Sequence, residues 1–181
     1  MRIGVDFDRV LFDTEEFKQY LEDEIPGFLD TYGLATGQGY DPERHAEIMD
    51  IDPDRIYDTL NYEEGRFLYE DVDELDEWDS EHEVVIISRG DPEFQGRKIE
   101  NAEPGFEYFI VTGKARENSK QLGEDTQHPG EDPLDFLVDD RDYEHENFAG
   151  PGYHFRRPED SLGDVVNENL EPVNLQPESS G

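Results

Sequence analysis

Four short apolar segments, each followed at once by polar residues, place the strongest constraint on the fold of this chain. They cover residues 2–5, 84–87, 108–111 and 136–138, and the second is β-branched throughout. Short apolar runs of this kind are typical of strands buried on both faces, as in a parallel sheet. Helical patterns separate them, and strands that alternate with helices predict an α/β fold, a Rossmann-like parallel sheet between layers of helices.

Residues 14–78 interrupt this alternation. They begin with a polar helix start at Asp13-Thr14 and continue as short helical pieces broken by proline and glycine. We therefore expect a small helical cap over residues 14–78, inserted after the first strand, and an α/β core formed by residues 1–13 and 79–157.

The remaining segments give weaker patterns. A polar helix is predicted over residues 115–122 and a weak fifth strand over residues 152–155. After Arg157 no aromatic residue occurs and polar residues dominate, so residues 158–181 are expected to form a loosely ordered acidic tail.

The composition is strongly acidic. The 181 residues include 49 acidic and 15 basic side chains, a net charge of -34, and only four of the basic residues are lysines. Such charge can accompany disorder, but 11 Phe and 9 Tyr supply a core. The composition resembles that of cytoplasmic proteins of halophilic archaea. Because molar salt shortens the Debye length to about 3 Å, we expect the fold to need high salt.

Several classes of function are disfavoured. The chain has no cysteine, so it has no disulfide or thiolate chemistry. No apolar run approaches the length of a membrane span, and no secretory signal is evident, so we expect a cytoplasmic protein without a membrane partner. The negative charge argues against binding to nucleic acid. The sequence leaves the oligomeric state open.

Polar residues with complementary chemistry follow each of the four predicted strands. In parallel sheets, ligands bind beyond the carboxyl ends of the strands. Two carboxylate pairs at this edge would repel each other unless a hard cation such as Mg²⁺ lies between them. A hydroxyl and cations beside that ion would suit a phosphate group. These residues are Asp6, Asp8, Ser88, Arg89, Lys114, Asp139 and Asp140.

Two assignments stay open at this point. Lys120 competes with Lys114 as the lysine of the phosphate site, and either Asp139 or Asp140 could be the direct metal ligand. Six of the 15 basic residues lie between positions 89 and 120, a local excess that could counter the acidic field at the site.

The residues after these strands resemble the four motifs of the haloacid dehalogenase-like hydrolases. The resemblance extends over residues 1–157. It includes the sequence from Ser88 to Gln95, the region of Lys98, and a helical insert like the small cap of many members. Arg9 departs from the pattern, because many phosphatases of the family have glycine there.

The resemblance implies a mechanism. Asp6 would be the nucleophile that attacks phosphorus, and Asp8 would protonate the leaving oxygen and then activate water. Mg²⁺ would be held by Asp6, the backbone carbonyl of Asp8 and Asp139 or Asp140, and Ser88, Arg89 and Lys114 would position the phosphoryl group. Dehalogenases of this fold generally lack the second acid and the metal, so Asp8 favours phosphoryl transfer.

The predicted function is a Mg²⁺-dependent phosphatase that hydrolyses a small phosphorylated metabolite, such as a nucleoside monophosphate or a sugar phosphate, through an aspartyl-phosphate. The alternatives are a phosphomutase with the same chemistry and a non-catalytic protein that binds a phosphorylated ligand. A glycosyltransferase with paired metal-binding acids would leave Ser88, Lys114 and the second acidic pair unexplained.

Overall fold

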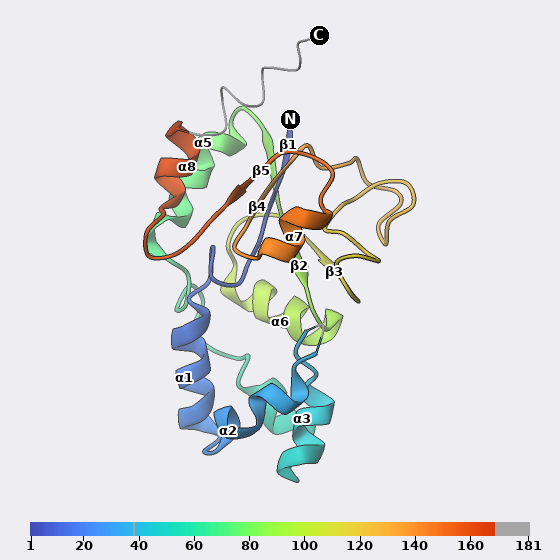
Figure 1. Ribbon diagram of the computed structural model, residues 1–181. Helices are drawn as coiled ribbons and strands as arrows, with labels where there is room; N and C mark the ends of the chain where they lie inside the picture. Colours follow the sequence, from blue (N-terminus) through green and yellow to red (C-terminus); the bar gives the residue numbers. More distant parts are fainter. Residues whose placement is uncertain (38, 169–181) are drawn as a thin grey trace.

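A computed structural model describes residues 1–37 and 39–168 of the chain. Its centre is a five-stranded parallel sheet in the order β3-β2-β1-β4-β5 (Figure 1). The strands are β1 (Arg2–Val5), β2 (Glu83–Arg89), β3 (Tyr108–Val111), β4 (Phe136–Asp139) and β5 (Gly152–His154). Each strand lies on a segment predicted from the sequence, and the α/β fold with a parallel sheet is confirmed.

Alternate residues of the central strands pack into two separate cores. Val84 and Ile86 of β2 join the larger core, together with Ile3 and Val5 of β1. Val85 and Ile87 point to the opposite face and join a smaller core. Because successive strand residues face opposite sides, four apolar residues in a row can be buried only when both faces of the sheet are covered.

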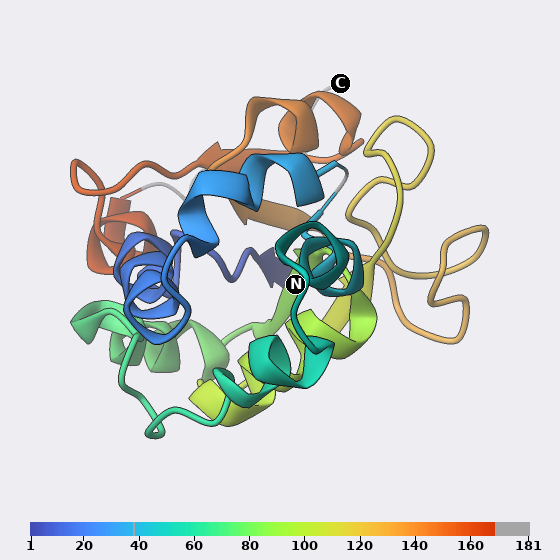
Figure 2. The same ribbon diagram turned by 90° about the horizontal axis from the view of Figure 1, so that it is seen from below.

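Different layers cover the two faces (Figure 2). The larger core is closed by α5 (Leu75–Asp79), α6 (Pro92–Ala102) and α8 (Leu162–Glu168), which bury Leu75, Ile99 and Leu162. On the other face lie α7 (Asp142–Asn147) and the long loop of residues 112–135, which buries Leu122 and Leu134.

The prediction of a helix over residues 115–122 is wrong. The segment forms turns without an α-helix, in which the backbone N–H groups of Glu117 and Asn118 both donate to the carbonyl oxygen of Lys114. The Asn118 side chain donates to the carbonyl of Thr112, and Gly123 has a φ of 105°. Local side-chain bonds of asparagine and a left-handed glycine both compete with helix formation.

The cap lies at the carboxyl ends of the strands (Figure 1). Its helices are α1 (Thr14–Glu24), α2 (Phe28–Tyr32), η1 (Gly33–Ala35), α3 (Pro42–Met49) and α4 (Pro53–Asp58). Its two connections to the sheet run together, because Asp13 N–H donates to the carbonyl of Phe67 and Tyr69 N–H to that of Leu11. The cap is thereby fixed directly above the segment that follows β1.

The end of the predicted cap belongs to the core instead. Residues of η2 (Glu70–Glu74) and α5 contact α8, and α5 also packs on β2. The boundary expected at residue 78 is therefore corrected to a point before Glu70, since these short helices bury Val72, Leu75 and Trp78 against the sheet layer.

The expected loose tail is also corrected in part. Residues 162–168 form helix α8, in which Leu162 and Val165 are fully buried. Two apolar residues at a spacing of three lie on one face of a helix, which is enough to hold a short segment against α5. The rest of the predicted tail, residues 169–181, lies outside the described residues. Within residues 1–37 and 39–168, no helix has the length and apolar character that crossing a bilayer requires.

We predict that Leu162→Ala destabilises the protein by about 2–5 kcal/mol, because it leaves a cavity in the larger core. Leu34→Ala is the matched control, since Leu34 is 63% exposed, and it should change stability by less than about 0.5 kcal/mol. Chemical denaturation measures both values. Equal stability of the two variants would show that α8 adds nothing to the fold.

Candidate active site

The carboxylates of Asp6 and Asp139 lie side by side at the carboxyl edge of the sheet. Val5 of β1 pairs with Val138 of β4, so the next residue of each strand reaches the same edge. Both aspartates are buried, and Lys120 bridges them: its Nζ lies 2.8 Å from Asp6 Oδ1 and 2.5 Å from Asp139 Oδ2. The N–H of Phe7 also donates to Asp6 Oδ1, at 2.8 Å.

The structure places Lys120, and not Lys114, at the site. Lys120 is buried between the two aspartates, whereas the side chain of Lys114 is exposed and lies outside the residues that line the cavity described below. The sequence left open whether Lys114 or Lys120 lies at the site. The turns of residues 114–119 bring Lys120 back to the edge of the sheet.

Asp140 completes a group of three carboxylates. Oxygen atoms of Asp6, Asp139 and Asp140 lie within 4.8 Å of one another. When all three acids are ionised, the positive charge of Lys120 leaves a formal charge of minus two. Oxygen donors with this residual charge fit a hard divalent cation such as Mg²⁺. Both acids of the second pair are therefore candidate ligands, although Asp139 is already held by Lys120.

Crowding of these acids changes their pKa values. Burial and the charge of Asp139 raise the pKa of Asp6 to about 6, although Lys120 opposes the change. Burial and the charge of Asp6 raise the pKa of Asp140 to about 7. Burial also raises the pKa of Asp139. Burial alone would lower the pKa of Lys120, but the charges of Asp139 and Asp6 outweigh it and raise that pKa.

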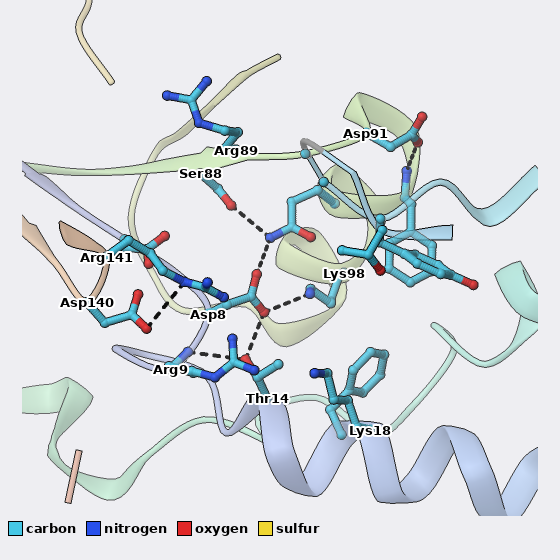
Figure 3. A pocket seen from close by; sticks show the side chains of 18 of the residues that line it. Asp8, Arg9, Thr14, Lys18, Ser88, Arg89, Asp91, Lys98, Asp140 and Arg141 are labelled. Carbon is cyan, nitrogen blue, oxygen red and sulfur yellow. Dashed lines mark hydrogen bonds and ion pairs between the residues drawn. The ribbon is translucent and has the colours of Figure 1, made fainter. Parts of the chain in front are cut away.

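Asp8 is separated from this group and has a cation of its own (Figure 3). Lys98 Nζ and Thr14 Oγ1 donate to its Oδ1, at 2.8 and 2.9 Å, and Gln95 Nε2 donates to its Oδ2 at 2.7 Å. Burial alone would raise the pKa of Asp8, but the charge of Lys98 and these three hydrogen bonds lower it to about 2. Its predicted metal contact, through the backbone carbonyl, stays a prediction.

Ser88 lies at the end of β2 next to Asp8, as the strand-end pattern predicts. It is buried, and the same Gln95 amide that binds Asp8 donates to its Oγ at 2.8 Å. Gln95 and Lys98 come from α6, the helix that follows β2, and Thr14 begins α1. The sequence prediction gave none of these three a role; their common signal is a position in the helix that follows a strand-end motif.

Arg89 lines the cavity described below and is bound within the protein. Its guanidinium binds both carboxylate oxygens of the buried Glu144, at 2.7 and 2.8 Å, and donates to the carbonyl oxygens of Gly113 and Asn118. These bonds use four of its five N–H donors, so Arg89 anchors the loop that carries Lys120. The expectation that Arg89 binds phosphate stays a prediction.

The loop between β1 and the cap is a tight turn. The carbonyl of Phe7 accepts from the N–H groups of Val10, Leu11 and Phe12, and Arg9 adopts a left-handed backbone with a φ of 66°. Glycine adopts this conformation without a steric penalty, whereas other residues do so at a cost. The turn therefore has the geometry expected of glycine while it carries an arginine side chain.

A cavity of about 200 Å³ lies between this edge of the sheet and the cap. The core contributes Asp6, Asp8, Ser88 and Lys120, and the cap contributes aromatic residues such as Phe17 and Tyr40. A ligand in the cavity would be in reach of both the paired acids and the cap.

Comparisons with known proteins agree with the fold. No protein-family model matches the sequence, and no curated protein matches it either. A solved structure named as a haloacid dehalogenase-like hydrolase from Burkholderia xenovorans matches with a TM-score of 0.52 and 17% identity, over 82% of this chain and 79% of that one.

Two further solved structures match with lower TM-scores. An L-2-haloacid dehalogenase from Xanthobacter autotrophicus with covalently bound chloropropionic acid has 17% identity and a TM-score of 0.47, over 96% of this chain and 85% of that one. A haloacid dehalogenase-like family hydrolase from Xanthomonas campestris has 22% identity and a TM-score of 0.40, over 61% of this chain. The match spans only 62% of the Xanthomonas protein's own length.

The raised pKa of Asp140 leads us to expect that the stability of the metal-free protein depends on pH. An unfolded aspartate ionises near pH 4, so the raised pKa of Asp140 makes the metal-free fold lose stability as pH rises from about 4 to about 7. We predict that Asp140→Asn in EDTA matches the wild type at pH 4.5 and is more stable at pH 8, by roughly 2 kcal/mol after discounting for screening.

Melting curves at both pH values, in EDTA, measure this effect. Asp58→Asn is the matched control, because Asp58 is exposed at the end of α4 and lies outside the cavity. A stability difference between Asp140→Asn and wild type that is the same at both pH values would contradict the prediction.

A second prediction concerns Asp8. Lys98→Met should raise the pKa of Asp8 from about 2 to above that of an ordinary aspartate, because burial then acts without its opposing charge. Carbon-13 NMR of labelled aspartate carboxyls, assigned with Asp8→Asn, measures the titration. Arg97→Met, at the exposed neighbouring position of α6, should leave it unchanged. An Asp8 pKa that stays near 2 in Lys98→Met would refute the assigned role of Lys98.

Proposed function

We propose that the protein is a Mg²⁺-dependent phosphatase of the haloacid dehalogenase-like class, which hydrolyses a small phosphorylated metabolite through an aspartyl-phosphate. The observation that carries the proposal is the separation of charges at the site. Asp8 has its own cation, Lys98, whereas Asp6, Asp139 and Asp140 share Lys120 and have a formal charge of minus two when all three are ionised, as they would be around a bound cation.

Asp6 is the proposed nucleophile. Lys120 and the N–H of Phe7 fix its Oδ1, so the other oxygen, Oδ2, would attack phosphorus. The attack forms a bond from Asp6 to phosphorus and breaks the bond to the leaving oxygen. A divalent cation bound by Asp6, Asp139 or Asp140 would neutralise charge on the phosphoryl oxygens. Ser88 would hold one of those oxygens, and Lys120 would keep the nucleophile oriented.

Asp8 is the proposed acid and base. With a pKa of about 2 it is ionised in the resting site at neutral pH. A phosphoryl group bound beside it adds negative charge, and a neighbouring like charge raises the pKa of a carboxyl group. Asp8 can then take the proton of a monoanionic phosphate ester, pass it to the leaving oxygen, and return as a carboxylate that activates water.

The other candidate functions use parts of the same site. A phosphomutase would share Asp6 and Asp8 but would have to keep water from the phosphoaspartate. A binding protein would not need Asp8 to be held by three donors. The Xanthobacter neighbour is named as a dehalogenase, and a dehalogenase would also use Asp6. The second acid and the residual charge of the carboxylate group favour phosphoryl transfer over these alternatives.

Phosphate release from a panel of phosphorylated metabolites, with and without Mg²⁺ and in molar KCl, tests the proposal. Molar KCl is used because we propose that the acidic surface needs salt. Asp6→Asn should abolish release, and Asp8→Asn should lower it roughly 10²- to 10⁴-fold. Lys120→Met should lower it at least about 100-fold, whereas Lys114→Met should retain wild-type activity.

Each outcome has a distinct meaning. Equal activity of the wild type and the Asp6 and Asp8 variants would refute the mechanism. Activity that is lost in Lys114→Met and kept in Lys120→Met would reverse the assignment of the two lysines. Binding of panel members without turnover of any of them would favour the non-catalytic alternative.

A further inference from the structure

The charge of the cavity differs sharply from that of the whole chain. Acidic residues outnumber basic ones by 49 to 15 in the sequence, but five acidic and six basic side chains line the cavity. This concentration of cations would not arise by sampling the surface at random. The basic residues are Arg9, Lys18, Arg89, Lys98, Lys120 and Arg141.

Three of these cations already neutralise acids of the site. Lys98, Lys120 and Arg89 each donate at 2.8 Å or less to a carboxylate in or beside the cavity. They account for the electrostatics of the paired acids. The other three, Arg9, Lys18 and Arg141, therefore need a separate explanation.

Lys18 is the clearest of the three. It lies on α1, half-buried, and its Nζ sits 4.7 Å from the centre of the Tyr32 ring. Within the described part of the chain, no carboxylate lies within 4.0 Å of this ammonium group. Burial and the nearby charges of Arg9 and Arg141 lower the pKa of Lys18, so an anion beside it would relieve both costs.

Arg141 and Arg9 are only weakly engaged. Arg141 is 48% exposed, and its Nε lies 3.8 Å from Asp140 Oδ2, at the limit of an ion pair. Arg9 binds Glu15 at 2.7 Å, but Glu15 is 68% exposed, and an ion pair so open to solvent contributes little. Both guanidinium groups can therefore turn to a ligand at small cost. Figure 3 shows Arg9, Lys18 and Arg141 around the cavity that contains Asp8.

The backbone of Arg9 adds an independent reason. A φ of 66° is unfavourable for any residue with a side chain. Its N–H bonds to the Phe12 carbonyl, at 2.9 Å, and to Thr14 Oγ1, at 3.2 Å, would be equally available to glycine. Strained backbone of this kind clusters at sites that bind ligands, and unlike Asp50 and Glu103, which end α3 and α6, Arg9 has a side chain that lines the cavity.

We propose that the substrate carries a second anionic group, a carboxylate or a second phosphate, which Lys18, Arg9 and Arg141 bind while its phosphoryl group lies against Asp6. The inference rests on the proposed function and narrows its substrate class. The cavity of about 200 Å³ is smaller than the roughly 300–1,000 Å³ of pockets for drug-sized ligands. A compact phosphorylated acid or bisphosphate therefore fits better than a nucleotide.

The test compares an anionic substrate with its neutral isostere and with a bisphosphate. The probes are 3-(phosphonooxy)propanoate, its neutral carboxamide, and propane-1,3-diyl bisphosphate. The wild type should show a kcat/KM at least about tenfold higher for the carboxylate or the bisphosphate than for the carboxamide, the ratio expected of one well-placed charge pair. The anionic probe with the higher value identifies the second group as carboxylate or phosphate.

Three variants assign the effect to residues. Lys18→Met and Arg9→Gly should reduce the ratio of anionic to neutral substrate toward one, and glycine suits the backbone of residue 9. Arg55→Met is the matched control, because Arg55 is an exposed cation of the same cap outside the cavity, and it should keep the wild-type ratio.

Binding gives a readout that does not depend on turnover. Calorimetry of the same three probes with Asp6→Asn should reproduce the preference for a second anion, and Lys18→Met in that background should remove it. Turnover without any preference for the anionic probes would overturn the inference and leave the phosphatase intact. A preference in binding with no turnover in the wild type would overturn the phosphatase and leave the inference intact. Absence of both would overturn both.

Discussion

The contact of Lys120 with Asp6 and Asp139 is the interaction on which the rest of the site depends. The parallel pairing of β1 with β4 forces these two aspartates together at one edge. Buried carboxylates are unstable without a counter-charge, and Lys120 supplies it from the loop of residues 112–135 that follows β3. Arg89 and Glu144 hold the loop that allows this. The absence of a helix before Lys120 is thus part of how the site is built.

Some acidic residues of the chain begin helices and belong to no carboxylate cluster of the site. Asp41, Asp52 and Asp91 each precede a proline and cap the helix that starts there, by accepting a hydrogen bond from a backbone N–H group. An aspartate cap followed by proline is a strong signal for a helix start. Such acids cannot be distinguished from surface charge by composition, but their position before proline identifies them.

The sheet and the strand-end residues could be predicted because both follow from local pattern: short apolar runs, and polar residues just after them. Lys120 could not be chosen over Lys114, because the choice depends on the turns of residues 114–119. The sequence of this segment has the pattern of a helix, which conceals those turns. Lys98 and Gln95 lie on a helix face whose direction depends on packing. Arg89 ends strand β2, where a ligand-binding residue is expected. Only the ion pair with Glu144, 55 residues away, shows that Arg89 also holds the structure together.

Asp8 connects the charge of a bound ligand to the protonation of the site. Lys98 and the hydrogen bonds of Asp8 hold its pKa at about 2, so in the proposed mechanism negative charge bound in the cavity would raise it toward the protonated form that an acid requires. In molar salt the Debye length is about 3 Å, so the distant acids of the surface contribute almost nothing to this balance. The ligand and the cavity's own side chains decide it. A bound anion would raise the pKa of Asp8 more than a neutral molecule of the same shape, so in the proposed mechanism binding of the anion also favours the protonated acid.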